Sequence, residues 1–230
     1  MFALVLASIL TRTGVSGYRE VKLAGWTLEV EPALISKYPH LWAAVRQEAG
    51  RQFEGIDRVV PDGPLSKLHA VTIWVHIKSP ETKCMAYHPA AEWLSRHHMD
   101  ARMAHGVEIG NAANFVSWTY EQPWMLLHEL AHSYHYLVLP QAENNPDVKA
   151  AYDAAMATHR YDDVRHWNGK MVKAYAATNP MEYFAECTEA YFGTNDFFPF
   201  VRGELEPADP DGYALMVKVW GKPVKRLPTD

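Results

Sequence analysis

The chain has 230 residues, of which 48% are hydrophobic and 21% are charged. This length and composition are typical of a folded globular protein with its own core, and they exclude global disorder. The formal net charge is −5 and there is no long run of Lys and Arg, so the sequence predicts no nucleic-acid or anionic-membrane partner. Cys84 and Cys187 are too far apart for a CxxC unit, which leaves open one disulfide or two free buried thiols.

The first ten residues are almost entirely apolar, but the stretch is too short to span a bilayer. With Val15-Ser16-Gly17 as a small-residue cleavage site, residues 1–17 resemble a secretory signal peptide, although the positively charged n-region is missing. A buried first strand or a misassigned start codon would give the same pattern. Cleavage would leave residues 18–230 as a single domain, secreted or periplasmic and without membrane insertion; an uncleaved chain would be cytoplasmic.

The first half of the chain alternates strand-like and helix-like stretches. Apolar residues recur at helical spacing between Tyr38 and Phe53, whereas Val71–Ile77 is β-branched and aromatic. In chain order we expect a strand or hairpin over 21–30 with a break at Gly25, a helix over 38–53, a buried strand over 71–77, a short helix over 89–96 and a short strand over 107–109.

The second half is predicted to be mainly helical. Pro123 is tolerated in a first turn and Pro140 ends the helix that follows it, while Asn179-Pro180 opens another helix that stops at Gly193. The expected helices cover 123–137, 147–158, 180–192 and 213–220. The predicted fold class is α+β, with an N-terminal mixed α/β half and a small twisted sheet packed on a mainly helical C-terminal half.

The strongest local signal is the run His128-Glu129-Leu130-Ala131-His132. Residues four apart on a helix share one face, about 6 Å apart along the axis, so both imidazoles can bind one Zn²⁺. Glu129 would stand beside the metal without binding it and take a proton from water. His135 shares this face but lies about 10.5 Å from His128 along the axis, so we assign it to packing or to support of a ligand.

A third ligand is expected from the helix after Asn179, where Glu182, Glu186 and Glu189 share one face among aromatic residues. Burying carboxylates without a cation or donors is costly, so Glu182 is predicted to bind zinc and Glu186 to accept a hydrogen bond from a ligating histidine. Alternatively, Glu182 completes a capping box with Asn179, and Glu186 is then the reserve ligand. Glu189 would face solvent or pair with an arginine.

HELAH followed about fifty residues later by EYFAE resembles the catalytic domain of the anthrax lethal factor-like zinc peptidases, a gluzincin group. The resemblance covers roughly residues 124–192. It implies a zincin-like fold with the active-site helix between the two halves, and zinc held by His128, His132 and Glu182. It also implies that Glu186 matches the family's second glutamate, and that Tyr175, seven residues before Glu182, is aimed at the developing oxyanion.

The sequence therefore predicts a zinc-dependent metallopeptidase that hydrolyses a peptide or protein substrate, with Glu129 as general base. The strand over 107–109 is expected to be the sheet edge that pairs with an extended substrate. Tyr87-His88-Pro89 and Phe197-Phe198-Pro199-Phe200 could line a substrate cleft, but core or turn packing is favoured for both stretches. A zinc hydrolase of a non-peptide amide or ester, a secreted binding module with structural zinc, and a metal-free helical protein are the alternatives.

Overall fold

The computed structural model describes residues 17–226, so the predicted signal peptide lies outside the described residues except for Gly17. A five-stranded sheet of order β1-β2-β3-β5-β4 forms in the N-terminal half. β2, β3 and β5 are parallel, whereas the outer strands β1 and β4 run antiparallel to their neighbours. The strands are β1 (Arg19–Leu23), β2 (Trp26–Val30), β3 (Ile73–Val75), β4 (Met85–Tyr87) and β5 (Val107–Ile109).

The predicted hairpin over 21–30 is confirmed as β1 and β2. Its two-residue turn, Ala24-Gly25, has positive φ angles of 50° and 84°. Positive φ at both central residues is the type I′ geometry that matches the twist of hairpin strands. The expected strand over 71–77 is shorter, and only Ile73–Val75 pairs with both neighbouring strands.

The prediction that the strand over 107–109 forms the sheet edge is wrong. β5 pairs with β3 on one side and with β4 on the other, so β4 is the edge. Cys84 and His88, which flank β4, hydrogen-bond to the β5 side through Gly110 and Gly106. Because backbone groups alternate in an antiparallel pair, the peptide groups of Met85 and Tyr87 point away from β5.

Helices cover the sheet and form the rest of the molecule. In the N-terminal half they are α1 (Pro32–Lys37), α2 (Pro39–Val59), α3 (Asp62–Leu68), α4 (Ala91–Arg96) and α5 (Ala112–Trp118). The C-terminal half has α6 (Met125–Leu137), α7 (Pro146–Ala157), α8 (Pro180–Phe192), α9 (Arg202–Ala208) and α10 (Pro210–Trp220), with a two-stranded hairpin of β6 (Val164–Arg165) and β7 (Met171–Val172). The α+β fold class is confirmed at this coarse level.

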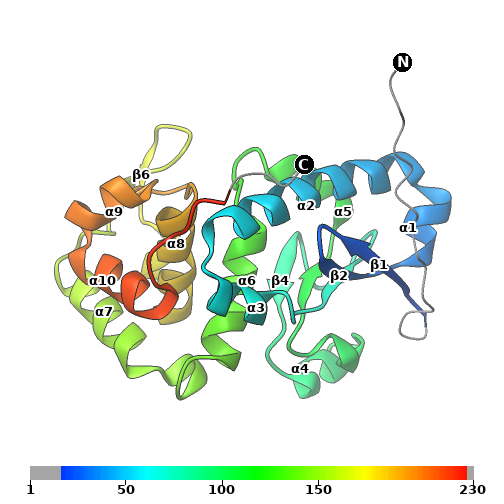
Figure 1. The fold of residues 1–230 in the computed structure, drawn as a ribbon, viewed down its shortest axis with the longest axis horizontal. Helices are drawn as coiled ribbons and strands as arrows, with labels where there is room; N and C mark the ends of the chain where they lie inside the picture. Colours follow the sequence, from blue (N-terminus) through cyan, green and yellow to red (C-terminus); the bar gives the residue numbers. More distant parts are fainter. Residues whose placement is uncertain (1–16, 227–230) are drawn as a thin grey trace.

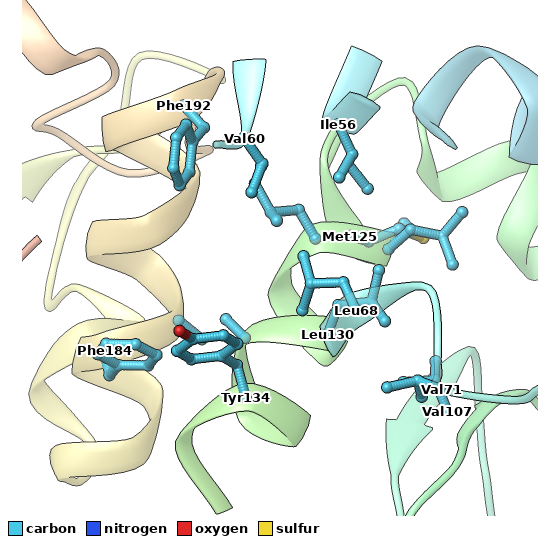
Figure 2. Packing of buried hydrophobic residues seen from close by; sticks show 14 of the residues in the cluster. Ile56, Val60, Leu68, Val71, Val107, Met125, Leu130, Tyr134, Phe184 and Phe192 are labelled. Carbon is cyan, nitrogen blue, oxygen red and sulfur yellow. The ribbon is translucent and has the colours of Figure 1, made fainter. Parts of the chain in front are cut away.

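The central helix α6 lies between the sheet and the C-terminal helices (Figure 1). Most of its apolar side chains are buried, as Figure 2 shows for Met125, Leu130 and Tyr134. Tyr134 lies 4.2 Å from Trp220 between ring centroids, on the side of the C-terminal helices. Burial on both sides fixes the rotation and height of α6, and therefore the direction of its polar side chains.

Both cysteines are free and buried, so of the two alternatives the structure has the one with two thiols. Cys84 Sγ lies 3.9 Å from Met125 Sδ. Among the helices of the described residues, none combines the length and apolar character that crossing a membrane requires.

Candidate metal centre

The two histidines of HELAH stand on consecutive turns of α6. Their ring centroids are 4.8 Å apart and the rings are inclined at 79°. The first turn of α6 is held from the N-terminal half, because Gln52 Oε1 accepts the Leu126 N–H at 2.9 Å. The helix thus presents both imidazoles in one direction, toward α8.

Glu182 reaches the same point from the first turn of α8. Asn179 caps this helix, and its Oδ1 accepts the N–H groups of Met181 and Glu182. The cap predicted from the sequence is therefore present. The Glu182 carboxylate is engaged by the histidines, with Oε2 lying 3.1 Å from His128 Nε2 and 3.2 Å from His132 Nε2.

These three side chains form a group that could hold a metal ion. One ligand atom from each lies within 4.8 Å of the others. Ligands about 2.0–2.1 Å from a tetrahedral Zn²⁺ would be about 3.3 Å from one another, close to the two distances observed. Two imidazole nitrogens and one carboxylate oxygen are a donor set found in catalytic zinc sites, so the residues fit this ion.

The electrostatics of the group favour a cation. Burial alone would raise the pKa of Glu182, but its hydrogen bonds with His128 and His132 outweigh this and hold the pKa well below the ordinary value. Burial would lower the pKa of His128, yet Glu182 and Glu189 raise it well above the ordinary value. The carboxylates that favour a proton on His128 would favour a divalent ion at the same place.

The other ring nitrogen of His128 is held by Glu189. His128 Nδ1 lies 2.7 Å from Glu189 Oε1, so the ring N–H donates to this carboxylate. Glu186 Oε1 is farther away, at 3.7 Å from Nδ1. Glu189, and not the predicted Glu186, thus accepts the hydrogen bond of the histidine ring. Glu189 is only 3% exposed, so, contrary to expectation, it does not face solvent. Two turns separate Glu189 from Glu182, and the His128 ring lies between their carboxylates.

Glu186 is buried next to this pair. It is 3% exposed, and its Oε2 has no hydrogen-bond partner among the described residues. Burial and the neighbouring Glu189 raise the pKa of Glu186 well above its ordinary value, which favours the neutral carboxylic acid.

Glu129 points to the opposite wall, toward the edge strand. Its Oε2 accepts the Tyr87 N–H at 2.8 Å. This N–H is one of the backbone groups of β4 that point away from β5, so the sheet edge fixes the carboxylate beside the two histidines. This partner of Glu129 could not be predicted, because β4 itself was not among the expected strands.

Tyr175 lies in a short 3₁₀ turn (Tyr175–Ala177) just before α8. Its hydroxyl donates to Glu182 Oε1 at 3.3 Å, and its ring centroid is 6.2 Å from that of His128. Burial, and then the Glu182 charge, raises the pKa of Tyr175 to about 12. A neutral phenol whose O–H donates to Glu182 therefore lies beside the three side chains, at the position that the resemblance implies.

An open cleft of about 860 Å³ contains these residues. The structure brings together every site residue predicted from the sequence, namely His128, Glu129, His132, Tyr175, Glu182 and Glu186, along its walls. His135 also borders the cleft, but it is 1% exposed, lies 5.1 Å from Phe184 between ring centroids, and has its pKa lowered to about 4 by burial and by His132.

A second buried network braces the edge strand and was missed in the sequence. Glu108, in the middle of β5, is fully buried and contacts His76 at 2.7 Å, His88 at 2.9 Å and the Thr82 hydroxyl. Thr82 and His88 flank β4 and line the cleft. A glutamate between Val107 and Ile109 was the available signal, since a charged residue in a buried strand needs partners.

No family model matches the chain, and no curated protein matches it either. A search of solved structures gives the Pro-Pro endopeptidase PPEP-2 from Paenibacillus alvei, with 19% sequence identity over 76% of this chain and 87% of that one, at a TM-score of 0.42. A likeness at this level establishes neither a shared fold nor a shared activity. The similarity of the motifs to lethal factor-like peptidases stays a prediction, and the case for a function rests on the cleft itself.

Proposed function

We propose that the chain is a zinc-dependent endopeptidase of the gluzincin type, in which residues 18–230 form one zincin-like domain. The observation that carries the proposal is the meeting of His128, His132 and Glu182 from two distant helices, with donor spacings that suit Zn²⁺. A structural zinc site would require neither a carboxylate like Glu129 nor a phenol like Tyr175 beside it.

Each residue has one role in the proposed reaction. Zinc, when bound, supplies a Lewis acid that lowers the pKa of water and polarises a carbonyl group. Glu129 removes a proton from the attacking water and later delivers it to the leaving amine. Tyr175 donates its O–H to the oxyanion of the tetrahedral intermediate, and Glu189 holds the His128 ring in one orientation.

The edge strand β4 favours a peptide over a small amide or ester. Both residues line the cleft, and the Met85 peptide groups and the Tyr87 carbonyl point away from β5, whereas the outward Tyr87 N–H is already bonded to Glu129. An extended chain can add to such an edge through main-chain hydrogen bonds, which recognise peptides irrespective of sequence. We therefore assign to β4 the substrate-pairing role that was expected of the strand over 107–109.

The decisive test is Glu129→Gln. The variant is expected to retain zinc and to lose activity by about 10²-fold or more, because general-base catalysis contributes about 10²–10⁴. Zinc is measured by elemental analysis, and cleavage is measured on a peptide library with and without a chelator. Glu54→Gln, an exposed carboxylate on α2, is the matched control and should behave as wild type.

Two results would overturn the proposal. If Glu129→Gln cleaves peptides as fast as wild type, Glu129 is not the general base. A wild-type protein with stoichiometric zinc that turns over no peptide but hydrolyses small esters would move the protein to the non-peptide hydrolases.

A further inference from the structure

Two tyrosines and a glutamate line the cleft, and their side chains take no part in the proposed chemistry. Tyr87 ends β4, Tyr136 lies near the C-terminus of α6, and Glu143 lies in the 3₁₀ turn Ala142–Asn144 that follows. All three border the cleft. The sequence favoured core or turn packing for Tyr87, and the structure has the alternative, a place on the cleft wall.

The two rings form an aromatic corner. Their centroids are 6.0 Å apart and the rings are inclined at 55°, and both side chains are half-buried. His105 stacks on Tyr136 at 5.8 Å and thereby steadies it. The faces of aromatic rings attract cations that come within about 6 Å of a centroid, because the ring quadrupole is negative above the plane.

The charge at this corner is negative. Glu143 is exposed and forms no hydrogen bond or ion pair with any described residue. Burial, then Tyr136 and Glu143, raises the pKa of Tyr87, so Glu143 stands close enough for its charge to act on this phenol. The Tyr87 hydroxyl is buried, with no hydrogen-bond partner among the described residues. Lys83, the one Lys or Arg among the described residues lining the cleft, lies before β4 rather than after it.

The corner lies next to the reacting groups. Tyr136 follows His132 by one helical turn, about 6 Å along the α6 axis. The Tyr87 N–H is the group that binds Glu129. An extended peptide advances about 3.3 Å per residue, so the side chain that reaches this corner belongs to a residue flanking the cleaved bond, within about two positions of it.

We infer that Tyr87, Tyr136 and Glu143 form a subsite for a Lys or Arg side chain of the peptide substrate, next to the scissile bond; this inference rests on the proposed peptidase function. The stem of the basic side chain packs on the two rings, and its charged head lies near Glu143. An acidic side chain is disfavoured there, because it would meet the Glu143 charge without a compensating cation.

The experiment uses matched fluorogenic peptides that carry Lys, Arg, Gln or Glu at the residues flanking the cleaved bond. Wild type is expected to show a lower KM and a higher kcat/KM for Lys and Arg peptides than for Gln peptides. Glu143→Gln should reduce this preference by about 2-fold to 5-fold, as expected for the loss of one exposed ion pair with the cation–π contact retained. Glu143→Lys should shift the preference to Glu peptides.

Tyr136 supplies an independent arm. Tyr136→Phe keeps the ring and should keep the preference for basic residues, whereas Tyr136→Leu should lower the ratio of kcat/KM for Lys peptides to kcat/KM for Gln peptides. Binding of uncleaved Lys and Gln peptides to the Glu129→Gln variant, measured by calorimetry, reads the same preference without turnover.

Three outcomes overturn the subsite while leaving the peptidase intact. In the first, wild type cleaves all four peptides equally, and in the second, Glu143→Lys keeps the preference for Lys and Arg. The third outcome concerns Glu81→Gln, which removes a charge from the cleft before β4: this variant weakens the preference as much as Glu143→Gln does. If the wild-type protein cleaves none of these peptides, whichever residue flanks the bond, the result contradicts the proposed peptidase function instead.

Discussion

At the scale of single residues, Glu189 is the carboxylate that sets the orientation of His128. Its hydrogen bond to Nδ1 leaves Nε2 for a metal ion, and both partners are shielded from water. We predict that Glu189→Gln lowers zinc affinity by about 10-fold to 100-fold, the range usual for such supporting carboxylates. Competition with a chromophoric chelator measures this directly.

Glu186→Gln is the matched comparison, because Glu186 is equally buried but lies farther from Nδ1. Its effect on zinc affinity should be smaller than that of Glu189→Gln. The reverse order would mean that Glu186 makes the functional contact in solution.

Glu108 predicts how stability changes with acid. Burial would raise the pKa of Glu108, but hydrogen bonds from His76, His88 and Thr82 outweigh it and bring the pKa to about 2, below the ordinary 4.5. Because the folded-state pKa is depressed, the stabilising contribution is fully present above pH 4.5 and is lost as the pH falls toward 2. In urea unfolding between pH 2 and 7, the free energy of unfolding should fall less steeply with acid for Glu108→Gln than for wild type. Glu54→Gln should show the same pH dependence as wild type.

Spacing predicted the pair of histidines, and the capped helix start predicted Glu182 with Glu186 in reserve, since these are local properties of each helix. The choice between Glu186 and Glu189 was not local. Both lie on the face that carries Glu182, and only the rotation of α8 against α6 decides which reaches His128. That rotation is set by side chains from both helices, such as Tyr134 and Phe184 (Figure 2).

At the scale of elements, long amphipathic helices were predictable and short edge structure was not. α6 and α8 lie within two residues of their expected bounds, because proline, asparagine and glycine mark their ends. β4 has three residues, none of them β-branched, and it exists because β5 offers it a partner. Strand order likewise depends on contacts between distant segments, which is why the edge was assigned to the wrong strand.

The junction of α6 and α8 depends on one close approach. A Cβ added to Gly193, directly after α8, would lie 2.1 Å from Trp124 Cε2, directly before α6. Gly193→Ala must displace the indole ring, so we predict a loss of about 1–3 kcal/mol in the free energy of unfolding and weaker zinc binding. Gly203→Ala is the control, since no atom lies within 4 Å of its added Cβ. Equal stabilities of the two variants in urea would contradict this account.

At the scale of the whole molecule, the three candidate zinc ligands come from parts of the chain that are far apart in sequence. A ligand that binds only the folded state stabilises it by about 2.7 kcal/mol when its concentration is 100 times the Kd. We therefore predict that zinc raises the Tm of wild type, that a chelator reverses the rise, and that His132→Ala abolishes it. Thermal unfolding followed by circular dichroism, with elemental analysis of the same samples, checks this; an identical Tm rise in His132→Ala would place the ion elsewhere.

His128 and Glu182 are 54 residues apart, and the segment between them includes α7 and the β6–β7 hairpin. An ion bound by His128 and Glu182 would hold the two ends of this segment together, in addition to the packing of Tyr134 and Phe184. Doubling the length of a flexible loop costs only about 0.6 kcal/mol in closure entropy, so insertions between β6 and β7 should be tolerated. By the same logic, a proteolytic nick in that hairpin would leave two fragments held together by the packing of α8 on α6, with His128 and Glu182 still side by side.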